Sequence, residues 1–321
     1  MEVNCEGCAG CCLDWRPLLE DLRDGEDDGT EGDDGIERDD EGVLERGHEH
    51  ERRGPYEPLD DVYNLVPLTR DEVRRFLEAG FADALTPRLW VADAESGHAV
   101  EIDGRRVTAI GGRPAFFVGL RKPPKPVAPF GREAEVWLST CTFLDPTTLQ
   151  CRIHGGDLFP DECATYPGYN LALEQETECE RVEATFGGDR LVSDDPPADA
   201  AALEGLLLGP GALGQKVFCH PRPDDLEGVV ERAATDALTA EDRAEFVAVA
   251  AASSLGTLGV SDRHYAEARE RALEADSWVG RSIREWERLA AEGDGDEPIP
   301  PAGIATDVEE DRGAPGTPGW E

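Results

Sequence analysis

Lysine is almost absent from this sequence of 321 residues. Only Lys122, Lys125 and Lys216 occur among its 31 basic residues, whereas Asp and Glu number 70, which gives a formal net charge of −39. Such a surface repels nucleic acids and anionic lipids, because binding to phosphate needs clustered cations. Salt near 1 M shortens the Debye length to about 3 Å and so screens the repulsion within the protein. The composition therefore predicts a halophilic protein that binds neither nucleic acid nor membrane.

Long apolar runs are also missing. No segment reaches the run of about 18 apolar residues that a membrane helix requires, and no basic segment followed by an apolar one resembles a signal peptide. We therefore expect a cytoplasmic protein, in which disulfides seldom persist. Nine cysteines in that compartment indicate metal or redox chemistry rather than cross-links.

The motifs of several enzyme classes are absent. The sequence has no Gly-rich phosphate loop, no H-E-x-x-H zinc motif and no nucleophile elbow. We interpret Gly111-Gly112 and Gly155-Gly156 as turns. No catalytic residue can be chosen among the 70 carboxylates, so whether the protein is an enzyme stays open, as does its substrate. The protein partner stays unknown, with a docking tail for a basic partner in the acidic segment ranked last, and a monomer is expected.

Eight of the nine cysteines fall into two groups along the chain. The first group, C-x-x-C-x-x-C-C, contains Cys5, Cys8, Cys11 and Cys12, and the second contains Cys141, Cys151, Cys163 and Cys179. Two intervening residues allow both sulfurs of a C-x-x-C pair to face one ion. Metal ligation by both groups would tie the N-terminus to residues 140–180, where local packing could not.

Cys11 and Cys12 are adjacent, so their side chains diverge in a helix or a strand. We therefore interpret the pair as divided between two sites, or between two metals of one cluster. The eight thiolates suit two four-coordinate centres, or one cluster plus one zinc. The remaining cysteine, Cys219, is expected to be a buried apolar residue.

Two functions remain open. Closed sites of four thiolates are structural and leave no position for chemistry, which favours a metal-binding module with zinc or iron. The first three cysteines share the C-x-x-C-x-x-C spacing of bacterial ferredoxins, which favours an iron–sulfur protein with a redox or radical role. His154, three residues after Cys151, is a candidate ligand or supporting residue, and His48 and His50 are expected to be solvated.

The two cysteine groups together resemble the CxxCxxCC zinc- or iron-chelating family, the YkgJ-type cysteine-cluster proteins. The likeness rests on the N-terminal cluster and on CTFLDPTTLQCRIHGGDLFPDECATYP, and it covers roughly residues 3–185. The matching positions in this stretch are Cys141, Phe143, Leu144, Cys151, Ile153, His154, Pro160, Cys163 and Pro167. Relatives have Tyr or His at the position of His154, but they usually have Tyr followed by an Arg-Pro pair, which this chain lacks, and they commonly have Arg at the position of Ala164. The resemblance implies metal chelation by the cysteines, and relatives of flagellin lysine methylases are among the suspected kin.

The fold expected from these patterns is α+β. Residues 1–190 should form a small, irregular, metal-stabilised cysteine-cluster domain with a short antiparallel β-meander and a disordered acidic insertion at about 24–54. Thr69 and Glu72 form a capping box for a helix over 70–79. Residues 191–292 should be helical, over 198–208, 224–238, 240–255 and 262–291, and residues 293–321 should be a disordered acidic tail.

Overall fold

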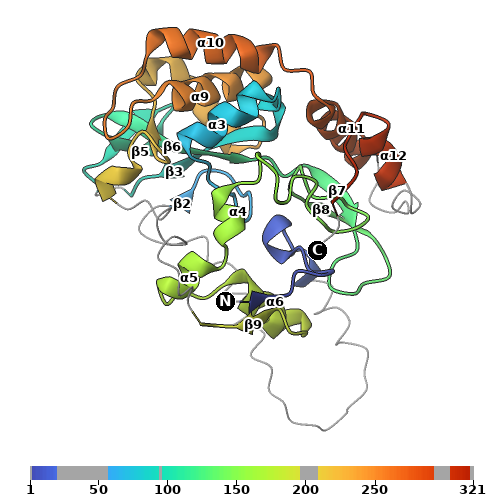
Figure 1. The fold of residues 1–321 in the computed structure, drawn as a ribbon. Coiled ribbons are helices and arrows are strands. Elements are labelled where there is room, and N and C mark those ends of the chain that lie inside the picture. Colours follow the sequence, from blue (N-terminus) through green and yellow to red (C-terminus); the bar gives the residue numbers. More distant parts are fainter. Residues whose placement is uncertain (1, 20–56, 94–95, 196–208, 293–303, 319–321) are drawn as a thin grey trace.

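The computed structural model describes residues 2–19, 57–93, 96–195, 209–292 and 304–318 (Figure 1). The predicted acidic insertion at about 24–54 and the predicted helix over 198–208 lie outside these residues. The described part is α+β with antiparallel sheets and with helices toward the C-terminus, as expected. Among the described residues, no helix combines the length and apolar character needed to cross a membrane.

The main sheet has six strands paired antiparallel, and its strand order departs from that of the predicted meander. Its strands are β2 (Glu57–Pro58), β3 (Leu85–Val91), β4 (Ala99–Ile102), β5 (Arg105–Ile110), β6 (Arg113–Leu120) and β10 (Phe218–Cys219). The strand order is β10-β6-β3-β5-β4, and β2 pairs with β3. Asp103-Gly104 and Gly111-Gly112 join neighbouring strands as two-residue turns with positive φ at both positions, the geometry that matches strand twist in tight hairpins.

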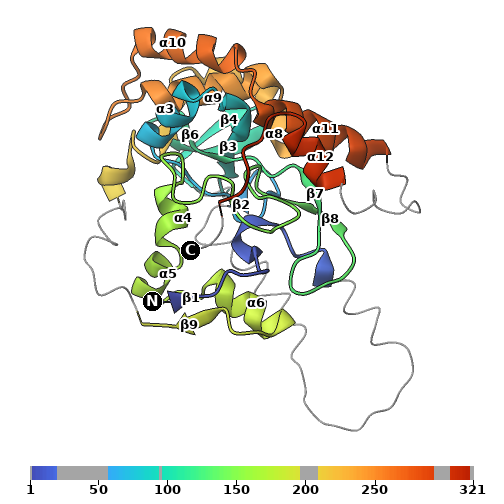
Figure 2. The same ribbon diagram turned by 45° about the vertical axis from the view of Figure 1, so that its right-hand side comes forward.

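Three helices lie on one side of this sheet (Figure 1, Figure 2): α3 (Arg70–Glu78), α9 (Ala240–Ala252) and α10 (Asp262–Leu273). The capping box of Thr69 and Glu72 is confirmed at the start of α3. Phe246 of α9 packs against Phe116 of β6, with ring centroids 4.9 Å apart. We call the sheet and these helices, with α8 (Val229–Ala234), the sheet body.

Two predicted helices are shorter than their sequence patterns indicated. The span 224–238 contains a 3-10 turn and then only α8, because Gly228 has a positive φ of 74° before its first residue. The span 262–291 divides into α10 and α11 (Trp278–Glu292). The side chain of Ser277 accepts a hydrogen bond from the N–H of Gly280 (3.3 Å), so a new helix begins there.

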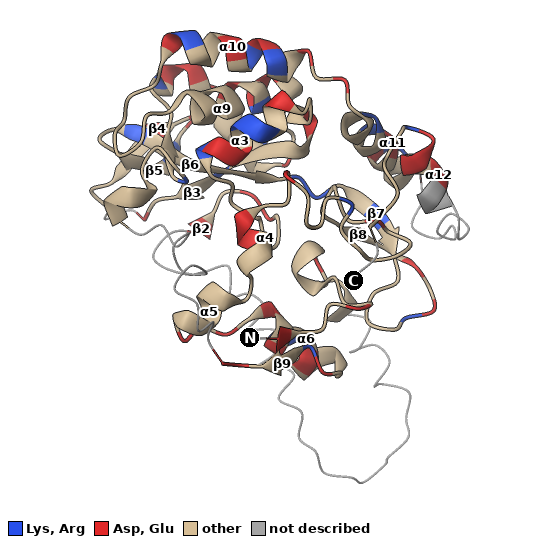
Figure 3. Ribbon diagram, in the orientation of Figure 1, with Lys and Arg blue, Asp and Glu red and all other residues tan. Residues whose placement is uncertain are grey.

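Charged side chains of both signs alternate along α10 (Figure 3), as in the pair of Arg263 and Glu267 at 3.7 Å.

The sheet body contains residues from both sides of position 190 in the sequence. Phe218 of β10 pairs with Phe116 of β6, and both are fully buried in the same hydrophobic core as α9. The predicted regions 1–190 and 191–292 therefore share one core.

The cysteine-bearing segments lie on the other side of the sheet from α9 and α10 (Figure 1, Figure 2). We call residues 2–19 and 121–195 the cysteine region. Its elements are β1 (Glu2–Val3), η1 (Gly10–Cys12), β7 (Pro124–Val127), β8 (Val136–Ser139), α4 (Asp161–Thr165), α5 (Gly168–Ala172), α6 (Glu178–Phe186) and β9 (Leu191–Ser193). Most are five residues or shorter, so long chain segments run irregularly between them.

The C-terminal segment is a correction to the predicted disordered tail. Within 293–321, residues 304–318 are described, and they contain α12 (Ile304–Glu310). Glu309 is fully buried and forms ion pairs with Lys125 (2.6 Å) and Arg152 (2.8 Å). An acidic composition predicts disorder when its charges are solvated, but this carboxylate meets two buried cations that lie far away in the sequence.

Candidate functional site

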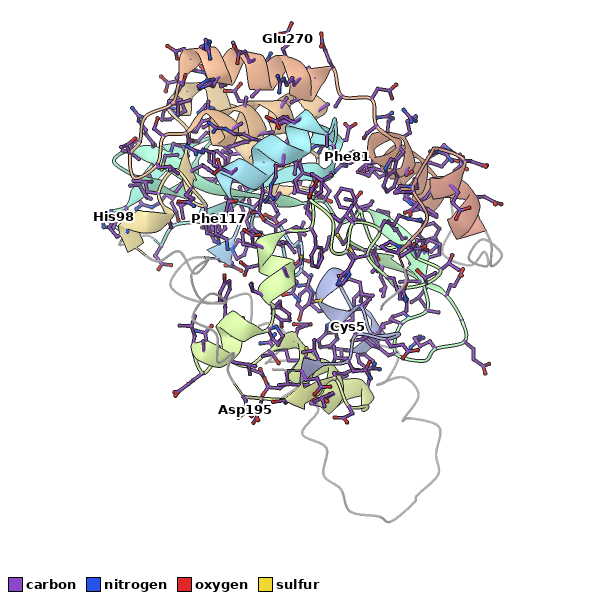
Figure 4. All side chains as sticks on the ribbon, viewed as in Figure 1. Cys5, Phe81, His98, Phe117, Asp195 and Glu270 are labelled. Atoms are coloured by element: carbon purple, nitrogen blue, oxygen red, sulfur yellow. The ribbon has the colours of Figure 1, made fainter. Side chains whose placement is uncertain are left out.

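A cavity of about 450 Å³ lies in the cysteine region, and all eight cysteines of the two predicted groups line it. They are Cys5, Cys8, Cys11, Cys12, Cys141, Cys151, Cys163 and Cys179. The cavity is enclosed mainly by apolar residues such as Leu120, Phe143 and Val182. Figure 4 labels Cys5 on the N-terminal segment. Cys219, expected to be a buried apolar residue, is buried in β10 and does not line the cavity.

Tight turns bring the N-terminal cysteines to the cavity. The N–H of Cys8 donates to the carbonyl of Cys5 (3.1 Å), and the N–H of Cys12 donates to the carbonyl of Ala9 (2.8 Å). Gly10 lies against α6, because a Cβ atom there would be 2.7 Å from Cγ2 of Val182 and 3.5 Å from the Cys8 sulfur. A larger residue at this position would force the side chain of Val182 to shift.

The second group reaches the same cavity along the loop that follows β8. The N–H of Cys141 donates to the carbonyl of Cys12 (2.7 Å), and Leu13 pairs with Thr140 beside it. Leu144 pairs with Cys151, so the loop between them returns to its starting point. The adjacent backbones therefore join the two sequence groups directly.

Two helices carry the remaining cysteines. Cys163 lies in α4, whose first N–H, at Asp161, donates to the carboxylate of Glu72 (2.8 Å) in α3. Cys179 lies in the first turn of α6, which begins with a capping box of Thr177 and Glu180. Each helix thus holds one cysteine at a fixed place on the cavity wall.

The thiols around the cavity hold their protons tightly. Burial raises the pKa of Cys5 to about 12, of Cys8 to about 11 and of Cys151 to about 12, and neighbouring thiols add to each shift. A hydrogen bond with Cys12, at an Sγ–Sγ distance of 3.9 Å, is the largest cause of the raised pKa of Cys11. Metals bind the thiolate form, so metal binding here would release protons.

Two cations accompany these thiols. Lys122 lines the cavity and its Nζ donates to the carbonyl of Cys11 (3.4 Å). Arg190 also lines it and donates from Nη1 to the carbonyl of Glu6 (2.9 Å). The positive charge of Lys122 lowers the pKa of Cys11, and that of Arg190 lowers the pKa of Cys5, each against the larger effects that raise it. Both side chains would offset part of the negative charge of bound thiolates.

A buried carboxylate on the wall escaped the sequence analysis. Glu178 precedes Cys179, is 1 % exposed and accepts hydrogen bonds from the indole N–H of Trp15 and from the hydroxyl of Tyr63 (2.8 Å). Trp15 lies three residues after Cys12, so Glu178 fastens the N-terminal segment to α6. Nothing local in the sequence distinguishes Glu178 from the many solvated acids, because its partners are more than a hundred residues away.

His154 also lines the cavity, with its ring centroid 4.8 Å from that of Phe159. His48 and His50 lie outside the described residues. Within the described ranges, no three Cys, His, Asp or Glu side chains meet closely enough to hold one metal ion. Eight soft sulfur donors with two nearby cations nevertheless form a donor set of the kind that zinc and iron–sulfur clusters take.

Comparison with known proteins identifies the family of the chain. Curated proteins and solved structures give no match. One family model, described as a family of unknown function (DUF7531), matches residues 1–321. The likeness to the CxxCxxCC proteins and the role of the cysteines therefore stay predictions. Because the matched model spans the whole sequence, the chain belongs to the family of unknown function DUF7531.

Proposed function

We propose that this protein binds zinc or iron through the eight cysteines that line the cavity. The observation that supports the proposal is their convergence: eight of nine cysteines, from five separate elements and loops, line one cavity, and the ninth lies in the sheet. A buried thiol is usually a small apolar residue. Apolar burial alone gives no reason for eight thiols to gather around one space.

The donor chemistry fits this proposal. Thiolates are soft ligands that suit zinc and iron–sulfur clusters, and Lys122 and Arg190 offset part of their charge. The sulfur of cysteine moves by rotation about a single bond, χ1, so the thiols on the wall can turn toward a bound metal. A metal with a closed thiolate shell would tie the N-terminal segment, the loop and α6 together.

An iron–sulfur protein with a redox or radical role is the second candidate. The cavity volume of about 450 Å³ supports it, because pockets of roughly 300–1,000 Å³ are those that take cofactors and small ligands. The ferredoxin-like spacing of Cys5, Cys8 and Cys11 points the same way. A cluster would supply electron transfer, and Lys122 and Arg190 would then also influence its potential.

Metal content and visible spectrum distinguish the two candidates. The protein should be purified without oxygen and in molar salt, because its composition predicts halophilic behaviour. Zinc without visible absorbance would support the metal-binding module. Iron with acid-labile sulfide and a broad violet-blue band would support the cluster. Protein that holds neither metal would contradict both.

Three cysteine-to-serine variants test which cysteines bind the metal. We expect Cys8→Ser and Cys163→Ser to lose metal and to destabilise the cysteine region, because each removes one ligand from the cavity. Cys219→Ser is the matched control, since it also removes a buried thiol but lies in the sheet; it should keep its metal. Full metal content in Cys8→Ser would show that the N-terminal cluster is not a ligand group.

A further inference from the structure

We infer that the eight cysteines form two metal sites of four thiols each, which meet between Cys11 and Cys12. The N-terminal site is Cys5, Cys8, Cys11 and Cys179, and the loop site is Cys12, Cys141, Cys151 and Cys163. This assignment rests on the proposed function. It differs from the order in the sequence, because Cys12 and Cys179 exchange groups.

The backbone joins Cys179 to the N-terminal site. The strands on either side of this site pair with each other, with Val3 of β1 opposite Leu191 of β9. Between these strands, Gly10 packs against Val182 of α6, which lies one turn after Cys179. A Cβ atom added at Gly10 would be 3.5 Å from the Cys8 sulfur. The segment 2–10 is thus fixed on both sides to the part of the chain that carries Cys179.

The backbone joins Cys12 to the loop site in the same way. Its carbonyl accepts the N–H of Cys141 at 2.7 Å, and the next residue, Leu13, pairs with Thr140. The N–H of Arg152, next to Cys151, donates to the carbonyl of Phe143 (2.9 Å). Cys12 therefore belongs to the network of backbone bonds that shapes the loop.

The sulfurs of Cys11 and Cys12 are 3.9 Å apart, so the two sites are neighbours. Two thiolates in one tetrahedral shell, with metal–sulfur bonds of about 2.3 Å, are also separated by about 3.8 Å. A single site containing both cysteines is therefore the alternative that an experiment must exclude.

Two fourfold variants separate these arrangements, since each removes four cysteines and they share three changes. Cys5→Ala/Cys8→Ala/Cys11→Ala/Cys179→Ala keeps the loop site complete. Cys5→Ala/Cys8→Ala/Cys11→Ala/Cys12→Ala keeps the four distal cysteines, which are only three of the loop thiols plus Cys179. We expect the first to retain metal with four sulfur ligands by X-ray absorption and to resist a chelator at least tenfold better than the second. The reverse order, or equal retention, would overturn the division.

A measurement on the unaltered protein covers the case in which these variants fail to fold. A chelator removes part of the metal, an alkylating reagent labels the exposed thiols, and mass spectrometry identifies them. The four thiols of one site should become reactive together, before or after the other four. The division would be overturned if all eight thiols were labelled in one step. It would also be overturned if Cys11 and Cys12 were labelled together before the other thiols of their sites. Wild-type protein without zinc or iron would instead contradict the proposed function itself.

Discussion

The sheet body and the cysteine region are stabilised by different means. In the sheet body, regular strands and helices bury apolar rings such as Phe116, Phe218 and Phe246, and the last seven residues of α9 are all buried. In the cysteine region the elements are short, and buried polar groups such as Lys125 and Glu178 lie among irregular segments. The comparison indicates that regular elements order the first region, whereas in the second, specific pairwise bonds between short segments add to apolar burial, since Leu13, Phe143 and Val182 belong to the same hydrophobic core.

Cysteine itself illustrates the contrast. Cys219 lies in β10 opposite Ala115 of β6 and behaves as a small apolar residue of the sheet. The eight other cysteines gather where the helices and strands are shortest. Cross-links by metal would be most useful in such a region, because binding of a structural metal contributes directly to folding.

Removal of the metal should have the largest effect, and only on one of the two regions. Structural zinc contributes about 10 kcal/mol or more in zinc-dependent domains, so a chelator should release the loops of the cysteine region. Hydrogen exchange followed by mass spectrometry should show faster exchange in residues 2–19 and 141–190, with β3, β6 and α9 still protected. Equal acceleration in both regions would show that the sheet body also depends on the metal.

Disruption of the buried ion pairs around Glu309 should have the second-largest effect on stability. Glu309→Gln leaves Lys125 without its buried counter-charge and leaves Arg152 with Asp145 as its buried partner (3.3 Å). Breaking a buried ion pair typically costs about 3–5 kcal/mol. Denaturant unfolding in molar salt should show this loss. The matched control is Glu231→Gln, which removes an exposed partner of Arg105 at 2.7 Å and should leave the unfolding midpoint unchanged. An equal loss in both variants would mean that the buried cluster has no special role.

Alkaline pH should give the smallest effect, and only without metal. Cys5 and Cys8 would ionise near 9.0 in the unfolded chain, but burial raises their pKa in the folded protein to about 12 and about 11. Because the unfolded chain loses these protons first, the free energy of unfolding should fall as the pH rises from about 9 toward 11. Unfolding curves of metal-free and metal-loaded protein check this, since bound thiolates have already lost their protons. A decline of the same size in both samples would contradict the explanation.

Local signals made part of the fold predictable. The capping box at Thr69 and the two-residue turn at Gly111-Gly112 depend on neighbouring residues, and both occur as expected. The end of α10 did not follow from periodicity, because Ser277 begins a new helix inside a continuous helical pattern. The burial of Glu309 could not be predicted either, since its partners lie about 160–180 residues earlier in the chain and charge composition alone favours disorder.

The cavity was predictable to a similar degree. Residue type and spacing identified all eight cysteines that line it. They could not show that Cys179 lies with the N-terminal segment, because the packing of Gly10 against Val182 decides this. The same limit applies to Glu178, whose burial depends on Trp15 and Tyr63.

The ion cluster around Glu309 also bears on the order in which the molecule is completed during synthesis. Arg152 follows Cys151 directly, and its guanidinium contacts Glu309 (2.8 Å) and the carbonyl of Pro315 (2.7 Å), both near the end of the chain. The ribosome makes the cysteine loop long before these partners emerge. The loop therefore receives these buried contacts only after residues 304–318 have been made, so a chain truncated before residue 304 would carry every cysteine and still lack the support behind Cys151.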